Sequence, residues 1–195
     1  LAYFLLKNCN KDKETTTTTT ENVDTLGSTT TTTTTTTERV TREVLVNDNV
    51  KLNAYADGIE EKLVAFLKKG DYKTMTEDQL KEMCFDFDNV NFEHGTANVL
   101  PESQVQLDNI AQILTAYPNV KIKIGGYTDK TGDEAVNKKI STERAEAVKK
   151  FLTDKGLAKQ VVGAEGYGSE FAVQPADASE ELRVTDRKVS VSVRN

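Results

Sequence analysis

One stretch in the second half of the chain constrains the fold most, because a strand pattern, a polar loop and a helix pattern follow one another directly. Residues 120–124 alternate apolar and charged side chains, which predicts a half-buried strand. Gly132 ends the loop, Asp133 is a favoured helix N-cap, and the apolar spacing beyond it predicts an amphipathic helix over residues 133–155. The expected apolar face of this helix consists of Ala135, Val136, Ile140, Ala147, Val148, Phe151 and Leu152.

This arrangement predicts a binding site where the loop meets the helix. The strand delivers Thr128 and Asp129 to that place, and the helix carries Asn137 and Arg144 about one and three turns beyond its start. A carboxylate, an amide, a guanidinium and free helix N–H groups would then converge. Such a site suits a zwitterionic ligand, because Asp129 can bind an ammonium while Arg144 and the helix N-terminus bind a carboxylate.

Each of these residues also has an ordinary structural interpretation. Asp129 fits a turn or capping position, where aspartate is favoured. Arg144 fits a solvated helix arginine that pairs with Glu143 or Glu146, and Asn137 fits a position on the helix surface. The order and spacing of these residues together favour the binding site.

Around these residues the chain resembles the OmpA-like peptidoglycan-binding domain, which also occurs in peptidoglycan-associated lipoproteins and flagellar stator proteins. The resemblance covers roughly residues 85–195, with its pieces in family order. The matching pieces are residues 90–97, residues 126–129, Asn137, Ser141, Arg144, Ala145, residues 166–168 and residues 186–189. The resemblance implies non-covalent binding of peptidoglycan.

The same resemblance implies roles for six residues. Asp129 matches the aspartate that holds the amino group of meso-diaminopimelate in the stem peptide, and Arg144 matches the arginine that holds its carboxylate. The other matches are flanking hydrogen-bonding positions and charges near the pocket, at Thr128, Asn137, Arg187 and Glu93. Glu93 stands where many members carry an aspartate, and Lys188 stands where a second arginine is common.

The remaining elements of the main domain follow from periodicity. Strands are predicted at residues 85–92, 161–167 and 186–193, and a helix that begins at Pro101 and ends before Pro118 precedes the strand at residues 120–128. Residues 169–185 are predicted as a loop with one helical turn. This order implies an α/β (α+β) sandwich, an OmpA-like βαβαβ-β domain in which helices cover one face of a four-stranded sheet.

The first 84 residues are predicted to hold an anchor, a tether and an extension. Residues 1–9 begin with six apolar residues and Lys7, which predicts the end of a membrane anchor, with a short hydrophobic tail as the alternative. Residues 10–43 contain two threonine runs and few large apolar side chains, which predicts a flexible linker. Residues 44–84 are expected to be a small strand–helix extension packed on the main domain at residues 85–195, because about 40 residues form too small a core to fold separately.

Other classes of function find little support. The net charge of −6 argues against binding of nucleic acid. His94 is the only histidine and is expected in a surface turn, so we expect no catalytic residue, no metal site and no cofactor. Cys9 and Cys84 lie far apart across the linker, which argues against a structural disulfide and leaves both free, both buried, or Cys9 cross-linking partners as alternatives.

We therefore expect a non-catalytic cell-wall anchor in the periplasm, tethered to a membrane by its N-terminal segment. The expected ligand is the diaminopimelate-containing stem peptide of peptidoglycan. The alternative is a structural or stator subunit of an envelope-spanning machine, whose residues 44–84 contact partner proteins. The family resemblance also leaves room for a homodimer.

Overall fold

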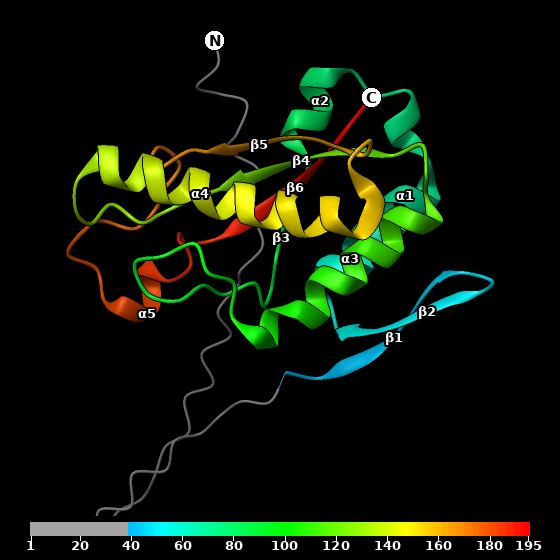
Figure 1. The fold of residues 1–195 in the computed structure, drawn as a ribbon, viewed down its shortest axis with the longest axis horizontal. Coiled ribbons are helices and arrows are strands. Elements are labelled where there is room, and N and C mark those ends of the chain that lie inside the picture. The colour runs from blue at the N-terminus through cyan, green and yellow to red at the C-terminus, as the bar shows by residue number, and fades with distance from the viewer. Residues whose placement is uncertain (1–38) are drawn as a thin grey trace, which may run out of the picture.

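The computed structural model of this protein describes residues 39–195 (Figure 1). The predicted anchor at residues 1–9 and most of the predicted linker at residues 10–43 lie outside the described residues, as does Cys9. The linker prediction was too long at its end, because strand β1 (Thr41–Asn47) begins two residues before residue 43. Within residues 39–195, no helix is both long and apolar enough to cross a membrane.

A four-stranded sheet forms the centre of the main domain, in the order β3-β6-β4-β5. Its strands are β3 (Cys84–Asp86), β4 (Lys121–Gly126), β5 (Val161–Gly166) and β6 (Val189–Arg194). The β4–β5 pair is parallel, whereas β6 runs antiparallel to both β3 and β4. Helices α3 (Gln104–Ala116) and α4 (Glu134–Leu152) cover one face of this sheet (Figure 1). The predicted α/β fold is confirmed.

Period-two alternation builds the core between the sheet and these helices. Ile122 and Ile124 of β4 and Val191 and Val193 of β6 are fully buried there. They belong to one hydrophobic cluster with Leu107, Ile110 and Leu114 of α3 and with Ala145, Val148 and Leu152 of α4. Burial of each large aliphatic side chain stabilises the fold by about 1.5–3 kcal/mol, so this cluster decides which face of each strand meets the helices.

Helix α4 lies unusually close to the sheet because two glycines face it. A Cβ atom added to Gly126 would lie against the carbonyl oxygen of Ser141, far inside the 3.0 Å that real Cβ atoms keep. A Cβ atom on Gly166 would lie equally close to the backbone nitrogen of Thr142. Asp133 begins the helix as predicted, since its side chain accepts a hydrogen bond of 3.0 Å from the backbone N–H of Val136.

Residues 41–84 form a hairpin and two helices that share the core of the main domain. After β1 come β2 (Val50–Tyr55), α1 (Ile59–Lys69), a single turn at Asp71–Lys73 and α2 (Glu77–Glu82). Gly70 ends α1 with a φ of 78°, and Thr76 begins α2 with a capping box to Gln79. Buried Glu60 of α1 accepts hydrogen bonds from Gln106 and Asn109 of α3, at 3.2 and 3.0 Å. The extension therefore packs on α3 through polar as well as apolar contacts.

Two of the predicted strands are shorter than expected. The strand predicted at residues 85–92 is limited to β3, because the N–H groups of Asp88 and Asn89 bind the side chain of Gln106 instead of a neighbouring strand. The strand predicted at residues 186–193 begins at Val189. Asp186 lies in the preceding turn, where its carboxylate accepts hydrogen bonds from the backbone of residues 173 and 174.

Two further expectations were wrong. Ala135 and Val136 are exposed, Val136 to 62%, because the first turns of α4 extend past the sheet and only the part from Ser141 onward is buried against it. Cys84 is disulfide-bonded. The sequence argument against a disulfide relied on separation along the chain, which does not limit how closely two segments approach in space.

The close approach of α4 makes Gly126 a sensitive position. Gly126→Ala should lower the free energy of unfolding by about 1–3 kcal/mol, because the new methyl group meets backbone that cannot move aside alone. Gly163→Ala on the neighbouring strand is the control, since its Cβ would approach nothing closer than 3.6 Å. Urea unfolding of the two variants measures the difference, and equal stabilities would contradict the close packing.

Candidate functional site

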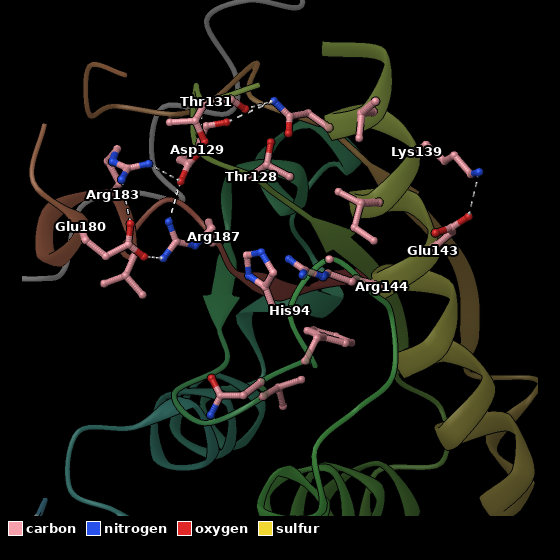
Figure 2. A pocket seen from close by; sticks show the side chains of 18 residues that line it. His94, Thr128, Asp129, Thr131, Lys139, Glu143, Arg144, Glu180, Arg183 and Arg187 are labelled. Carbon is pink, nitrogen blue, oxygen red and sulfur yellow. Dashed lines mark hydrogen bonds and ion pairs between the residues drawn. The ribbon is translucent and has the colours of Figure 1, made fainter. Parts of the chain in front are cut away.

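A pocket of about 640 Å³ lies where the β4–α4 loop, the start of α4 and the turn after Phe92 meet the segment that leads into β6 (Figure 2). Five of the six predicted site residues line it: Thr128, Asp129, Asn137, Arg144 and Arg187. The structure thus brings together residues that are up to 59 positions apart, from Thr128 to Arg187. The full lining is Val90, Asn91, Phe92, His94, Gly95, Thr128, Asp129, Thr131, Val136, Asn137, Lys139, Ile140, Glu143, Arg144, Glu180, Arg183, Val184 and Arg187.

Glu93 is the predicted site residue that does not line the pocket. Its exposed carboxylate accepts a hydrogen bond of 2.9 Å from the side-chain amide of Asn98, within the small loop that the Phe92–Val99 bridge closes. Phe92 on its N-terminal side lines the pocket, whereas Glu93 does not. The neighbouring His94 does line the pocket, although the sequence placed it only in a surface turn.

The loop after β4 is held by its own polar groups. The backbone N–H of Thr128 donates to the carbonyl of Gly168 at 2.9 Å, which extends the β4–β5 pairing into the loop. Asp129 then accepts hydrogen bonds from both the N–H and the hydroxyl of Thr131. The side-chain NH₂ of Asn137 donates to the carbonyl of Thr131 at 2.9 Å. Asn137 therefore fastens the loop to α4, and its NH₂ group is used by the protein itself.

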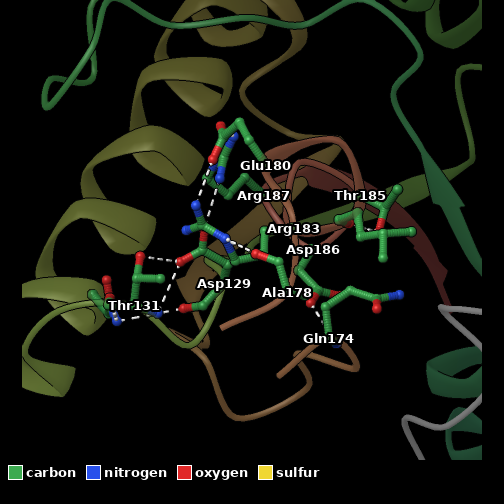
Figure 3. Close-up of polar contacts among 11 residues, drawn as sticks. Asp129, Thr131, Gln174, Ala178, Glu180, Arg183, Thr185, Asp186 and Arg187 are labelled. Carbon is green, nitrogen blue, oxygen red and sulfur yellow. Dashed lines mark hydrogen bonds and ion pairs between the residues drawn. The ribbon is translucent and has the colours of Figure 1, made fainter. Parts of the chain in front are cut away.

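Asp129 lies in a network of four charged side chains (Figure 3). Its Oδ2 atom is 2.6 Å from a guanidinium nitrogen of Arg187 and 3.5 Å from one of Arg183. Glu180 of the short helix α5 (Glu180–Arg183) contacts the other ends of both guanidinium groups. Two carboxylates thus hold two arginines between them, so these four charges balance.

This network determines the charge of Asp129. Burial alone raises the pKa of its carboxyl group, but the hydrogen bonds from Thr131 and the contact with Arg187 outweigh burial and hold the pKa below its usual value. The same contacts raise the pKa of Arg187 despite its partial burial. Asp129 is therefore ionised at neutral pH and already has cationic partners before any ligand arrives.

Arg183 and Glu180 were not predicted from the sequence as site residues. Both lie in residues 169–185, where only a loop with one helical turn was predicted. The one available signal was the spacing of Glu180, Arg183 and Arg187 by three and four residues, which brings side chains to one face of a helical turn. That signal does not reveal Asp129 as their common partner, since it lies 54 and 58 positions away from the two arginines.

Arg144 reaches into the pocket from α4 without a carboxylate partner (Figure 2). Its Nε–H donates to the backbone carbonyl of Thr96 at 3.0 Å, and its guanidinium lies 5.1 Å from the centre of the Phe92 ring. Within residues 39–195 it forms no ion pair. The ion pairs of Arg144 with Glu143 or Glu146 that the sequence allowed do not form. Glu143 instead pairs with Lys139 at 3.9 Å, and Glu146 pairs with Lys149 at 3.3 Å.

The environment of Arg144 makes its charge costly. Burial lowers the pKa of its guanidinium, and the positive charge of Arg187 lowers that pKa further. Nearby, the hydroxyl of Thr128 is buried and has no hydrogen-bond partner among the described residues. The pocket therefore offers one cation without a counter-charge among the described residues, and an unpartnered hydroxyl is buried in its wall, a combination that suits a carboxylate.

The pocket contains charged groups that suit the binding of a ligand. Its titratable groups are paired with one another, apart from Arg144 and His94, and no serine or cysteine lines it beside a base. In the part of the chain that the structure describes, no group of three or more His, Cys, Asp or Glu side chains could hold a metal ion. What the arrangement can do is bind an anion and hold it in one orientation.

Comparison with known proteins gives a family match over the same region. The OmpA family model matches residues 91–186. Outer membrane protein P5 of Haemophilus influenzae is 36% identical over 112 residues, which is 53% of this chain and 32% of the relative. Peptidoglycan-binding protein ArfA of Mycobacterium tuberculosis is 32% identical over 104 residues, again 53% of this chain and 32% of the relative. The chain thus spans 32% of the length of these two relatives.

Two solved structures are similar to this chain, and the one with a TM-score above 0.5 shows the same fold. A putative MotB-like protein from Desulfovibrio vulgaris has a TM-score of 0.51 at 19% identity, and the match covers 69% of this chain and 91% of that one. The peptidoglycan-associated lipoprotein from Burkholderia pseudomallei is 28% identical, with a TM-score of 0.47 and coverage of 54% of this chain and 88% of that one. The first of these likenesses extends beyond the family match, since it covers more of the chain.

The lowered pKa of Asp129 predicts a pH-dependent contribution to stability. A carboxyl group whose pKa is lower in the folded state stabilises the fold above its unfolded pKa of about 4, and this stabilisation is lost as the pH falls through the lower folded value. Asp129→Asn should lower the free energy of unfolding by about 1.5–3 kcal/mol at pH 7. The difference from the wild type should shrink progressively below about pH 4.

Urea unfolding between pH 7 and pH 3 measures this effect. Asp154→Asn is the matched control, because its carboxylate forms an exposed pair with Lys150 one helical turn away. This control should change the free energy of unfolding by less than about 0.5 kcal/mol at every pH. A deficit of Asp129→Asn that stays constant down to pH 3 would contradict the role of the ionised carboxylate.

Proposed function

We propose that this chain binds peptidoglycan non-covalently through the pocket between the β4–α4 loop and α5, in the region that the OmpA family model matches. The proposed ligand group is the diaminopimelate of the stem peptide. Its carboxylate would contact Arg144 and the hydroxyl of Thr128, and its ammonium would approach Asp129. The similarity to ArfA, a peptidoglycan-binding protein, supports this class of ligand.

One observation carries this proposal: a half-buried arginine lacks a counter-charge within the described residues. A buried charge without a partner costs free energy, because the protein interior replaces water poorly. The carbonyl of Thr96 and the ring of Phe92 offset only part of this cost for Arg144. A carboxylate ligand would supply both the missing negative charge and a hydrogen-bond acceptor for the unpartnered hydroxyl of Thr128.

The ammonium of the ligand would meet a carboxylate that already has partners. Asp129 is the only acidic side chain of the β4–α4 loop between residues 127 and 132. Its Oδ2 atom contacts Arg187, so an arriving ammonium adds to an existing network instead of filling an empty position. We infer that the carboxylate contact at Arg144 contributes most of the affinity, while Asp129 mainly selects ligands that carry the ammonium.

The biological role that fits this chemistry is a non-catalytic anchor on the cell wall. The proposed location is the periplasm, with the N-terminal segment as the tether to a membrane. The matched relatives include outer membrane proteins, which agrees with a place in the cell envelope. The role of a stator subunit, with residues 44–84 contacting partner proteins, stays an alternative prediction.

The proposal predicts a large effect at Arg144. Arg144→Gln in the full chain should weaken binding of a diaminopimelate-containing muropeptide by about 2–5 kcal/mol, because the carboxylate of the ligand loses its charged partner. Isothermal titration calorimetry measures this change. Arg42→Gln is the matched control, since Arg42 forms its ion pairs with Asp57 and Glu61 on the extension, far from the pocket lining.

A muropeptide with lysine in place of diaminopimelate tests whether the pocket recognises the additional carboxylate. A lysine-containing stem peptide lacks the carboxylate that diaminopimelate carries, so the wild type should bind it about as weakly as Arg144→Gln binds the diaminopimelate form. Failure of the wild type to bind any muropeptide would overturn the proposed function. Equal binding by the wild type and Arg144→Gln would leave peptidoglycan binding in place and move the site elsewhere.

Removal of the unpartnered Thr128 hydroxyl tests whether this group contacts the ligand. Thr128→Val keeps the shape of the side chain and removes the hydroxyl, which should weaken muropeptide binding by about 0.5–1.5 kcal/mol. Stability should not fall, because the hydroxyl has no partner in the free protein to lose. Thr115→Val is the control for the substitution itself, since the Thr115 hydroxyl donates to the carbonyl of Ala111 at 2.8 Å outside the pocket. A loss of stability without loss of binding in Thr128→Val would contradict the assignment.

A further inference from the structure

Helix α5 places a carboxylate of the protein itself against two arginines of the pocket. Glu180 contacts a terminal nitrogen of Arg187 and lies 2.8 Å from a terminal nitrogen of Arg183. All three residues line the pocket (Figures 2 and 3). This contact is not needed to place the arginines, because Arg187 is also held by Asp129 and Arg183 also donates to the carbonyl of Ala178 at 3.0 Å.

The two carboxylates of this network differ greatly in exposure. The side chain of Asp129 is 5% exposed, whereas that of Glu180 is 61% exposed. Asp129 is also held by Thr131, so its position is set by the loop. An exposed ion pair is worth only about 0–1 kcal/mol, because water competes for both charges. Glu180 is therefore the member of the network that another carboxylate can replace at low cost.

The arginines themselves are well placed to bind a second anion. Their side chains are only 20% and 28% exposed, and their inner nitrogens are oriented by the fixed carboxylate of Asp129. Their outer nitrogens are directed toward Glu180, which occupies the position that an anion from outside would take. A planar guanidinium held in this way is preorganised for a carboxylate.

From this geometry we propose that Arg183 and Arg187 form a second carboxylate subsite, which Glu180 fills in the free protein and vacates for a second carboxylate of the ligand. The inference rests on the proposed function, and it deepens that function by naming the ligand class: a wall peptide with two free carboxylates, one at Arg144 and one at Arg183 and Arg187. Arg144 and Arg187 line the same pocket, so one ligand of that size can reach both.

Two muropeptides that differ in one group test the subsite. The first is a muramyl tripeptide that ends in diaminopimelate and carries both of its carboxylates free. The second is the same tripeptide with its chain-terminal carboxylate converted to an amide. Calorimetry with the full chain compares the wild type, Glu180→Gln and Glu181→Gln, where exposed Glu181 does not line the pocket and controls for the change in net charge.

Glu180→Gln should bind the dicarboxylate tripeptide about 2–5-fold more tightly than the wild type, because removing a competing exposed pair is worth up to about 1 kcal/mol. Glu181→Gln should not reproduce this gain, and the amidated tripeptide should bind the wild type and Glu180→Gln alike. Arg183→Gln provides the opposite test, since it should reduce the preference for the dicarboxylate tripeptide over the amidated one.

The outcomes separate this inference from the proposed function. Normal binding by the wild type, with equal effects of Glu180→Gln and Glu181→Gln on both tripeptides, would overturn the second subsite alone. Weaker binding by Glu180→Gln would also overturn it, since Glu180 would then support the arginines instead of competing with the ligand. Absence of binding to both tripeptides by the wild type would overturn the proposed function and the subsite with it.

Discussion

The close contact between α4 and the sheet is the constraint on which the rest of the structure depends. Gly126 and Gly166 lie where β4 and β5 meet the backbone of residues 141 and 142, and neither position has room for a Cβ atom. This contact sets the angle at which the helix leaves the sheet, and hence where Asn137 and Arg144 lie relative to the loop after β4. Apolar burial then holds the arrangement, because Ala145, Val148 and Leu152 continue the contact along the helix.

The site contains one group of charges that are paired within the protein and one charge that is not. Around Asp129 the protein balances its own charges, since Arg183 and Arg187 lie between the carboxylates of Asp129 and Glu180, and the hydrogen bonds from Thr131 together with Arg187 keep Asp129 ionised. Arg144 receives no such compensation among the described residues, even though burial and the charge of Arg187 oppose its protonated form. The difference separates a part of the site that is complete in the free protein from a part that a ligand would complete.

The extension at residues 41–84 belongs to the same hydrophobic core as the main domain and cannot be regarded as an appendage alone. The carboxylate of Glu60 is buried in that core, where it accepts hydrogen bonds from two side-chain amides of α3. The carboxylate of Asp88 accepts a hydrogen bond from the N–H of Ile59 at the start of α1. The extension therefore also holds the segment that leads to the turn after Phe92. Its packing therefore supports the scaffold of the site, although none of its residues lines the pocket.

Local sequence determined most of the elements and the residues that meet in the pocket. Period-two patterns located the strands, Asp133 and Pro101 marked helix starts, and the order of the motifs indicated five pocket residues. These features depend on neighbouring residues, so they can be read along the chain. Only the tertiary structure decided which charges are paired: it joined Asp129 to two arginines more than 50 positions away, and it left Arg144 without the glutamate partners that its own helix offered. Charge pairing depends on distance and burial in three dimensions, and neither quantity is encoded in spacing along a single element.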